Sequence, residues 1–268
     1  MKQWIIILWA YFKIGLAKHF YYRGTVLISV LSKLISLGFL IFLWSKIFQS
    51  EGEVGGKTLS QIIVYYLFAY IARTITSPNV ATIIGERIRD GVLQMYILRP
   101  GHVLFSFFSM PLSKRLYELL VLLSLALFAQ ILIFPSLGLS IGNLHYPAFI
   151  LLLILGMLIN FFAASIIAAS AFWILDSGPI LYSYSSVTGI LSGLLVPISF
   201  FPSWARKTIE FLPFRFTISD PVLALQGEIA GMKLLTSVVL AIFWVFALGM
   251  INSLLWRKGT KRFDAVGN

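Results

Sequence analysis

Residues 147–175 read PAFILLLILGMLINFFAASIIAASAFWIL and contain no charged side chain. A membrane-spanning helix needs about 20 mostly apolar residues, so this run is long enough to cross a bilayer and to tilt or extend beyond it. An open sheet would leave backbone groups unpaired in lipid, and a β-barrel shows short alternating segments. The run therefore predicts a transmembrane α-helix.

Five other windows have the same character. They are Val26–Phe48, Leu59–Ile75 running towards Ile84, Leu116–Phe134, Ile180–Ser199 and Leu234–Trp256. The whole chain is 59% hydrophobic and only 12% charged, whereas a soluble domain is about a quarter charged. No long polar stretch separates the windows. We therefore expect an all-α membrane protein with six transmembrane helices in one domain, residues 1–268.

The distribution of Lys and Arg sets the orientation. With the N-terminus inside, thirteen basic residues fall on the cytoplasmic side and six outside, while Lys33 and Arg73 fall within spans. An even number of spans places both termini in the cytoplasm. The net charge of +11 then fits cytoplasmic loops lying against anionic lipid, and we expect no nucleic acid partner.

Catalytic and metal-binding constellations are lacking in the sequence. Cysteine is absent, which excludes a disulfide framework and a thiolate metal site. His19, His102 and His145 lie far apart and on both sides of the predicted membrane, so they do not form a metal site with an acid at ligand spacing. We expect no catalytic or metal-binding residue.

Residues 52–58, GEVGGKT, resemble a phosphate-binding P-loop. The motif needs a glycine at position 51, which is Glu51 here, and Gly52 is one residue too close. A transmembrane helix precedes the segment where a P-loop has a buried strand. The segment is predicted to be a flexible polar turn between two spans, and the chain is predicted to bind no ATP itself.

Two segments outside the spans are unusually apolar. Residues 1–25 are rich in Trp and Tyr with scattered Lys, which favours an interfacial helix on the inner leaflet; an extra half-span or a frayed tail is the alternative. Residues 200–232 are too apolar for an ordinary loop, but prolines prevent a single span. Two short re-entrant helices are expected there, capped by Ser203 and started by Asp220-Pro221. The alternative is a loop folded against its own spans.

The loop between the second and third spans, residues 79–115, contains the most informative segment. Ile84, Ile88 and Val92 recur at every fourth position, which predicts a short helix with one apolar stripe. Both signs of charge surround it. Such a helix suits docking into a partner's groove, and a solvated loop that satisfies the positive-inside rule explains it equally well.

Three charges are placed within or beside the predicted spans, Lys33, Arg73 and Glu118. Charges in the bilayer are costly and are usually paired. A pair between Glu118 and either Arg73 or Lys33 would reduce the cost of removing the carboxylate from water. The alternative is a role in moving a substrate. Asn160, in the fourth span, is expected to bond a neighbouring helix.

The run Arg89-Asp90-Gly91-Val92-Leu93 through Ile97-Leu98-Arg99-Pro100 resembles the first cytoplasmic loop of type-2 ABC-transporter permeases. The layout is similar as well, since such permeases have an interfacial N-terminal helix, six spans and an apolar external segment before the last span. The resemblance implies a coupling helix that docks on a separate ATPase subunit. The residues it assigns to this coupling are Glu86, Arg87, Ile88, Arg89, Asp90, Gly91 and Leu93, with Arg99 and Pro100 shaping the exit.

The resemblance implies the transmembrane subunit of an ATP-driven exporter in a prokaryotic plasma membrane. ATP and Mg²⁺ would bind the partner ATPase, and a second permease subunit, identical or similar, would complete the path. The alternatives are a secondary transporter or channel not driven by ATP, and a membrane-embedded enzyme. The first lacks midplane acids and matching helix breaks, and the second lacks clustered catalytic side chains.

Overall fold

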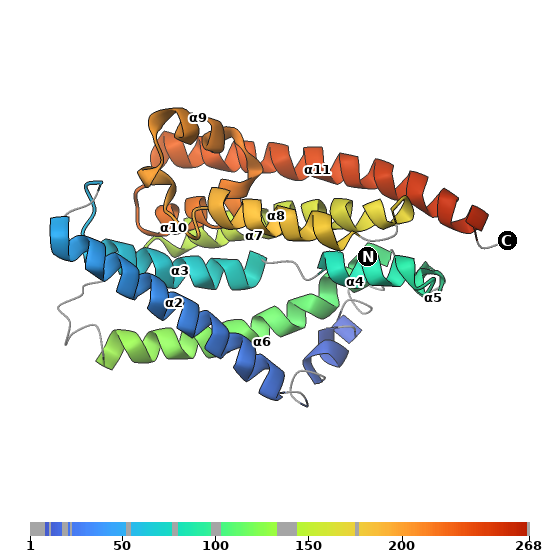
Figure 1. Cartoon of the computed structure of the whole chain (residues 1–268), viewed down its shortest axis with the longest axis horizontal. Coiled ribbons are helices and arrows are strands. Elements are labelled where there is room, and N and C mark those ends of the chain that lie inside the picture. Colours follow the sequence, from blue (N-terminus) through green and yellow to red (C-terminus); the bar gives the residue numbers. More distant parts are fainter. Residues whose placement is uncertain are drawn as a thin grey trace.

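The computed structural model describes residues 9–10, 12–17, 21, 23–51, 55–76, 80–97, 103–132, 144–174 and 177–266, and helices dominate them (Figure 1). The main helices are α2 (Arg23–Glu51), α3 (Leu59–Thr76), α4 (Val80–Arg89), α5 (Leu93–Ile97), α6 (Val103–Leu132), α7 (Tyr146–Ala169), α8 (Gly178–Leu191), α9 (Ser203–Phe211), α10 (Ser219–Leu225) and α11 (Gly231–Val266). Short 3₁₀ turns η2 (Ser170–Phe172), η3 (Ile198–Phe200) and η4 (Pro213–Thr217) join some of them. The prediction of an all-α fold is confirmed.

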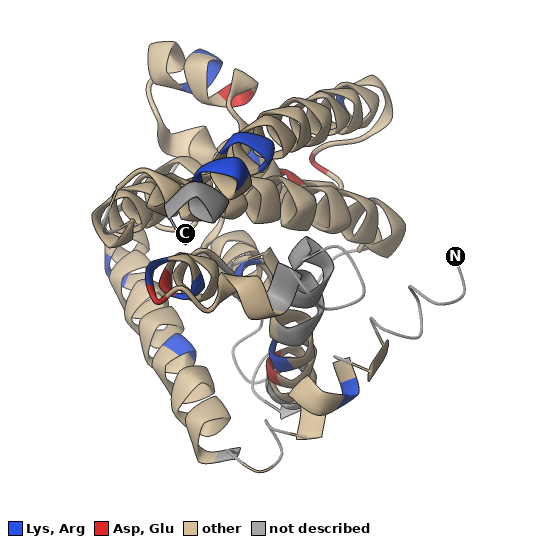
Figure 2. Cartoon of the chain, turned by 90° about the vertical axis from the view of Figure 1, so that its right-hand side faces the viewer, with Lys and Arg blue, Asp and Glu red and all other residues tan. Residues whose placement is uncertain are grey.

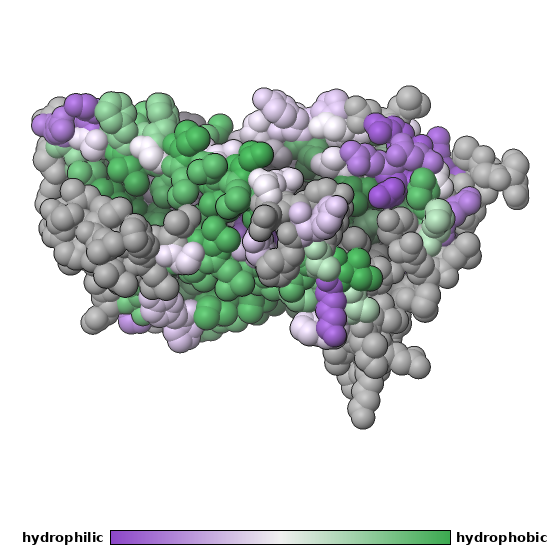
Figure 3. All heavy atoms as spheres, turned by 90° about the horizontal axis from the view of Figure 1, so that it is seen from below, coloured by the Kyte–Doolittle hydropathy of each residue, from purple (hydrophilic) through white to green (hydrophobic). Residues whose placement is uncertain are grey.

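Four helical stretches in the described chain are long and apolar enough to cross a membrane. They are Gly24–Gln49, Leu59–Arg89, Tyr146–Phe172 and Gly231–Arg262, and they contain three of the six predicted windows and most of a fourth, 147–175. The described part of a further window, Leu116–Phe134, lies in α6. Seen from below, apolar residues fill the middle of the surface and hydrophilic residues gather most densely at the right-hand end (Figure 3). This pattern is that of a multi-pass membrane protein with a polar end.

The window at Ile180–Ser199 differs from the prediction of one continuous helix. Helix α8 ends at Leu191 after 14 residues, which corresponds to about 21 Å of helix and is short of a bilayer core of about 30 Å. Gly193 follows with a φ of +84°, a left-handed conformation that glycine adopts readily. Pro197 then precedes η3. Gly193 and Pro197 interrupt the helix but lower the average hydropathy of the window only slightly, so hydropathy alone does not reveal the break.

Two tyrosines of α3 satisfy the carbonyl groups that this break leaves free. The Tyr65 hydroxyl donates to the Gly193 carbonyl at 2.8 Å, and the Tyr66 hydroxyl donates to the Leu195 carbonyl at 2.9 Å. The Trp44 indole N–H donates in turn to the Tyr66 hydroxyl at 2.7 Å. Irregular backbone at membrane depth is tolerated where protein groups satisfy it, so α3 makes the break after α8 possible.

The segment 200–232 contains two short helices, as predicted, but they differ in environment. Helix α10 is buried against α7 and α3, so this part is folded against its own spans. Helix α9 lies at the top of the view in Figure 1 and exposes Trp204 and Phe211. Helix α10 begins at Ser219, one residue before the predicted Asp220-Pro221 start. The expected Ser203 cap is wrong, because Pro202 occupies the cap position of α9 and makes no side-chain capping bond.

Helix α7 lies at the centre of the packing. It contacts α3, α4, α10 and α11, and at Gly156 a methyl group would lie 2.3 Å from the Phe216 carbonyl oxygen. The Tyr184 hydroxyl donates to Asn160 Oδ1 at 2.5 Å, so the prediction that Asn160 bonds a neighbouring helix is confirmed. Of residues 1–25, the described residues 12–17 are helical, and the interfacial placement of this segment stays a prediction.

Candidate functional site

The predicted coupling segment is a helix-turn-helix rather than one helix. Helix α4 ends at Arg89, and α5 begins at Leu93. Between them, Gly91 has a φ of +71°, a conformation that a residue with a β-carbon adopts only with strain. The apolar stripe therefore does not continue as a helix to Val92. Helix α6 begins at Val103, within the predicted loop 79–115.

The apolar stripe points into the protein itself. Ile84, Ile88 and Leu93 are buried, in a cluster with Phe161 of α7 and Trp256 of α11. The hypothesis that this stripe is the ridge that docks into a partner's groove is therefore wrong. Periodicity indicates which residues share a face, but it does not indicate what covers that face. The stripe fixes α4 to α7.

The exposed side of the same segment is polar and charged. Glu86, Arg89, Asp90 and Gly91 are exposed, and Arg87 is partly buried. Arg89 Nε lies 3.3 Å from Asp90 Oδ1, with about half of each side chain exposed, so this pair contributes little to stability. We call residues 86–91 the charged tip.

Charges of both signs gather at this end of the molecule. Figure 2 views it end-on and shows blue and red on α4 and blue on the C-terminal end of α11. The basic residues on that end of α11 are Arg257, Lys258, Lys261 and Arg262. The two other residues assigned to coupling, Arg99 and Pro100, lie outside the described residues.

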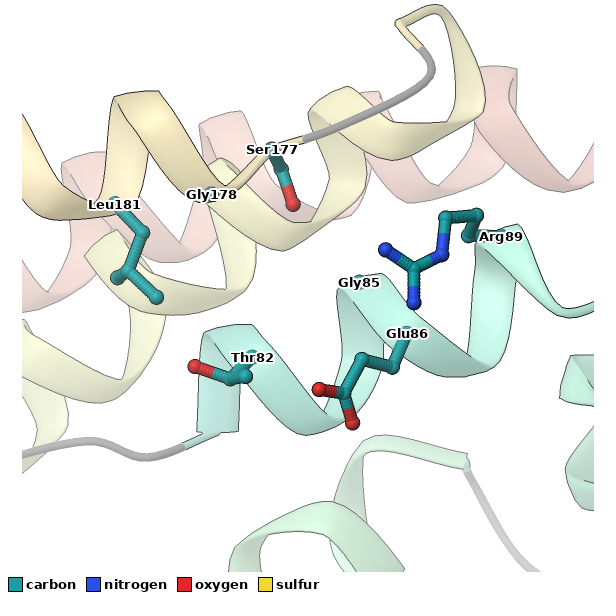
Figure 4. A pocket seen from close by; sticks show the side chains of 7 residues that line it. All are labelled: Thr82, Gly85, Glu86, Arg89, Ser177, Gly178 and Leu181. Carbon is teal, nitrogen blue, oxygen red and sulfur yellow. The ribbon is translucent and has the colours of Figure 1, made fainter.

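A small hollow separates the charged tip from the start of α8. Its lining comes from α4 and the residues around Gly178, as Figure 4 shows: Thr82, Gly85, Glu86, Arg89, Ser177, Gly178 and Leu181. Its volume of about 90 Å³ is well below the 300–1,000 Å³ of a typical small-molecule pocket. The hollow is suited to a single side chain of another protein and not to a cofactor.

The approach of α4 to α8 depends on a glycine. A β-carbon at Gly85 would lie 2.6 Å from Ser177 Oγ, and the Ser177 hydroxyl points toward α4 in Figure 4. This contact was not predicted from the sequence. Ser177 occupies the cap position of α8 but makes no side-chain capping bond. Gly85 and Gly178 are the sequence features that could have predicted this close approach of α4 and α8.

Charges that were predicted to lie within or beside the spans form a cluster between α2 and α6. The Lys33 ammonium donates a hydrogen bond to the buried Glu118 carboxylate, which confirms the predicted pair with Lys33. Lys114 Nζ lies 3.4 Å from the second carboxylate oxygen. The alternative partner, Arg73, makes no ion pair with the described residues.

Two basic residues of this cluster were assigned to the cytoplasmic loop by sequence. Lys114 and Arg115 both lie in α6, and Arg115 is buried. Arg115 Nη1 donates to the Ile75 carbonyl at 3.2 Å near the end of α3. A hydropathy window counts every Lys and Arg as an exposed charge, so it places Lys114 and Arg115 outside the helix bundle. In the structure, a nearby carboxylate and a backbone carbonyl bind these side chains and make their position in the bundle possible. The cluster connects α2, α3 and α6.

Comparison with known protein families matches residues 34–267 to the family described as ABC-2 family transporter protein. The match covers most of the chain, and the chain belongs to this family of ABC-transporter membrane components. The resemblance to type-2 ABC permeases is thereby confirmed. A search of curated proteins found no match.

Proposed function

We propose that the chain is the transmembrane subunit of an ATP-driven exporter whose ATPase is a separate protein. The observation that carries the proposal is the two-sided segment of α4 and α5. Its charged tip is exposed at the polar end of the molecule, and its apolar side is buried against α7 and η2. A surface that is fixed to the spans on one side and accessible on the other is suited to transmitting a partner's movement.

The coupling follows from these contacts. The ATPase contacts Glu86, Arg87, Arg89 and Asp90, and one of its side chains enters the hollow beside Gly85. A displacement of α4 then moves α7, because the buried side of α4 packs on it and close-packed interiors transmit strain. Helix α11 follows because it packs on α7. Gly91 permits the turn, while Ile88 and Leu93 hold it in place. Arg99 and Pro100 shape the exit towards α6.

The remaining features of the complex are part of the same proposal. The chain crosses a prokaryotic plasma membrane six times, with both termini in the cytoplasm and α4 and α5 on the cytoplasmic side. Helix α8 and the apolar residues after it form the shortest of the six crossings. ATP and Mg²⁺ bind the ATPase, and a second permease subunit completes the path. Most of the surface of α2 and α11 is apolar and exposed in the single chain, which leaves room for that subunit and for lipid.

A charge-reversal variant tests the coupling surface. Replacing Arg89 by Glu reverses the charge at an exposed position of the charged tip and leaves the turn at Gly91 intact. We expect the amount of co-purified ATPase to fall several-fold while the thermal stability of the spans stays unchanged. Lys207→Glu, a reversal on the exposed face of α9, is the matched control and should leave ATPase binding intact. Unchanged binding by the charged-tip variant would remove the coupling assignment.

A further inference from the structure

The P-loop-like segment ends in a buried ion pair. Gly55 and Gly56 have φ values of +60° and +72°, and this left-handed turn leads into Lys57. Lys57 is only 8% exposed, and its Nζ donates to both carboxylate oxygens of Glu228 at 2.6 and 2.8 Å. Glu228 lies between α10 and α11. The lysine that resembles a phosphate-binding residue therefore has a carboxylate partner within the chain.

Further contacts join the same two parts of the chain. Gln226 Nε2 donates to the Gln61 carbonyl at 3.2 Å. A β-carbon at Gly55 would lie 2.6 Å from the ring of Phe200, so the turn lies directly on that ring. Phe200 stacks in turn on Trp44 with ring centroids 5.0 Å apart. Both ends of segment 200–232 are thus fastened to the turn and to the helices beside it.

This ion pair differs from the cluster around Glu118 in its access to water. The Glu228 side chain is 40% exposed, whereas the Glu118 side chain is only 6% exposed. Separating the two charges of an ion pair is costly when water cannot hydrate either charge afterwards. Glu228 is already partly hydrated, so separating it from Lys57 costs less than separating Glu118 from its lysines.

We propose that Lys57 and Glu228 form a latch that fastens the turn at residues 55–57 to the connection between α10 and α11 and that opens during the transport cycle. This inference rests on the proposed function, because an exporter must open its external end to release its cargo. Phe200 and Glu228, near the two ends of segment 200–232, both contact the turn at residues 55–57. Release of the ion pair frees the connection between α10 and α11 at Glu228, while α10 stays packed against α7 and α3.

The reactivity of Lys57 towards an amine-acylating reagent tests the latch in the native complex. The permease is purified with its ATPase, and acylation of each lysine is measured by mass spectrometry without nucleotide and after trapping with ATP and vanadate. We expect Lys57 to react slowly without nucleotide and several-fold faster in the trapped complex. Lys207, exposed on α9, is the control and should react equally in both states.

The outcomes separate the latch from the proposed function. If the complex hydrolyses ATP but Lys57 stays protected in every state, the latch is wrong and the exporter function stands. If no ATPase co-purifies, the exporter function fails and the ATP-driven latch fails with it.

A single substitution tests the contact itself. Glu228→Gln should raise the reactivity of Lys57 several-fold without nucleotide, because the amide no longer binds the ammonium as an ion pair. Glu210→Gln, on the exposed side of α9, should leave the reactivity of Lys57 unchanged. Equal protection of Lys57 in the native protein and the Glu228→Gln variant would show that the ion pair does not hold the segment.

Discussion

The cluster around Glu118 gives the most quantitative prediction. Replacing Glu118 by Leu leaves Lys33 and Lys114 without their shared carboxylate. Removing one partner of a buried ion pair costs about 3–5 kcal/mol, whereas exposed pairs contribute at most about 1 kcal/mol. Glu118 is buried and the two lysine side chains are 22% and 28% exposed, so we expect a loss near the lower end, about 3 kcal/mol.

The assay is thermal unfolding of the purified chain in a mild detergent. A loss of 1 kcal/mol lowers Tm by about 2–4 °C in a domain of 150–250 residues, so Glu118→Leu should lower Tm by about 6–12 °C. The triple variant Lys33→Met, Lys114→Met and Glu118→Leu removes the carboxylate and both lysines that pair with it, while Arg115 keeps its hydrogen bond to the Ile75 carbonyl. This variant should recover most of the loss, because apolar replacement of buried ion pairs is often neutral. An unchanged Tm for Glu118→Leu would refute the reasoning.

The triple variant also separates the two roles considered for these charges. If they only pair with one another, the variant should be stable and should support ATP hydrolysis by the complex at the native rate. A stable variant that no longer supports stimulated hydrolysis would assign the charges to the substrate path. Lys46→Met is the matched control, since Lys46 is an exposed lysine of α2.

Three further predictions concern substitutions of single residues. Gly156→Ala should destabilise the fold by about 1–3 kcal/mol, because its new methyl group meets the backbone of η4 in a well-packed core; a native Tm would contradict that packing. Tyr65→Phe should cost about 1–2 kcal/mol by leaving the Gly193 carbonyl without its donor, and equal stability would show that the break after α8 needs no such bond. Because the chain has no native cysteine, single cysteines report topology: one at Lys207 should react with an impermeant thiol reagent in intact cells, and one at Arg89 only after permeabilisation. Reversed access would overturn the orientation.

Much of the fold could be predicted from the sequence because lipid restricts the backbone to a few solutions. A long apolar run such as 147–175 has no stable alternative to a helix, and α7 forms within it. Local sequence patterns did not predict the structure where it depends on contacts with residues far along the chain. The helix break at Gly193 is stable because Tyr65 and Tyr66 supply donors, and no local pattern reveals those donors.

The candidate site was predicted in part for a similar reason. The resemblance and the charge pattern located residues 86–93, and the structure places their exposed charges at the polar end of the molecule. The direction of the apolar stripe was wrong, because the same periodicity fits a stripe facing a partner or facing α7. Lys57 was likewise treated as part of a polar turn, since its partner Glu228 is distant in sequence and only the fold brings them together.

Purification of the tagged chain from native membranes under mild solubilisation, with ATP hydrolysis measured on the purified sample, tests the central claim most directly. We predict that a separate ATPase co-purifies and that the sample hydrolyses ATP, because the chain is the membrane component of an ABC system. Purification of the chain alone and without hydrolysis, under conditions that keep known ABC complexes intact, would contradict the claim.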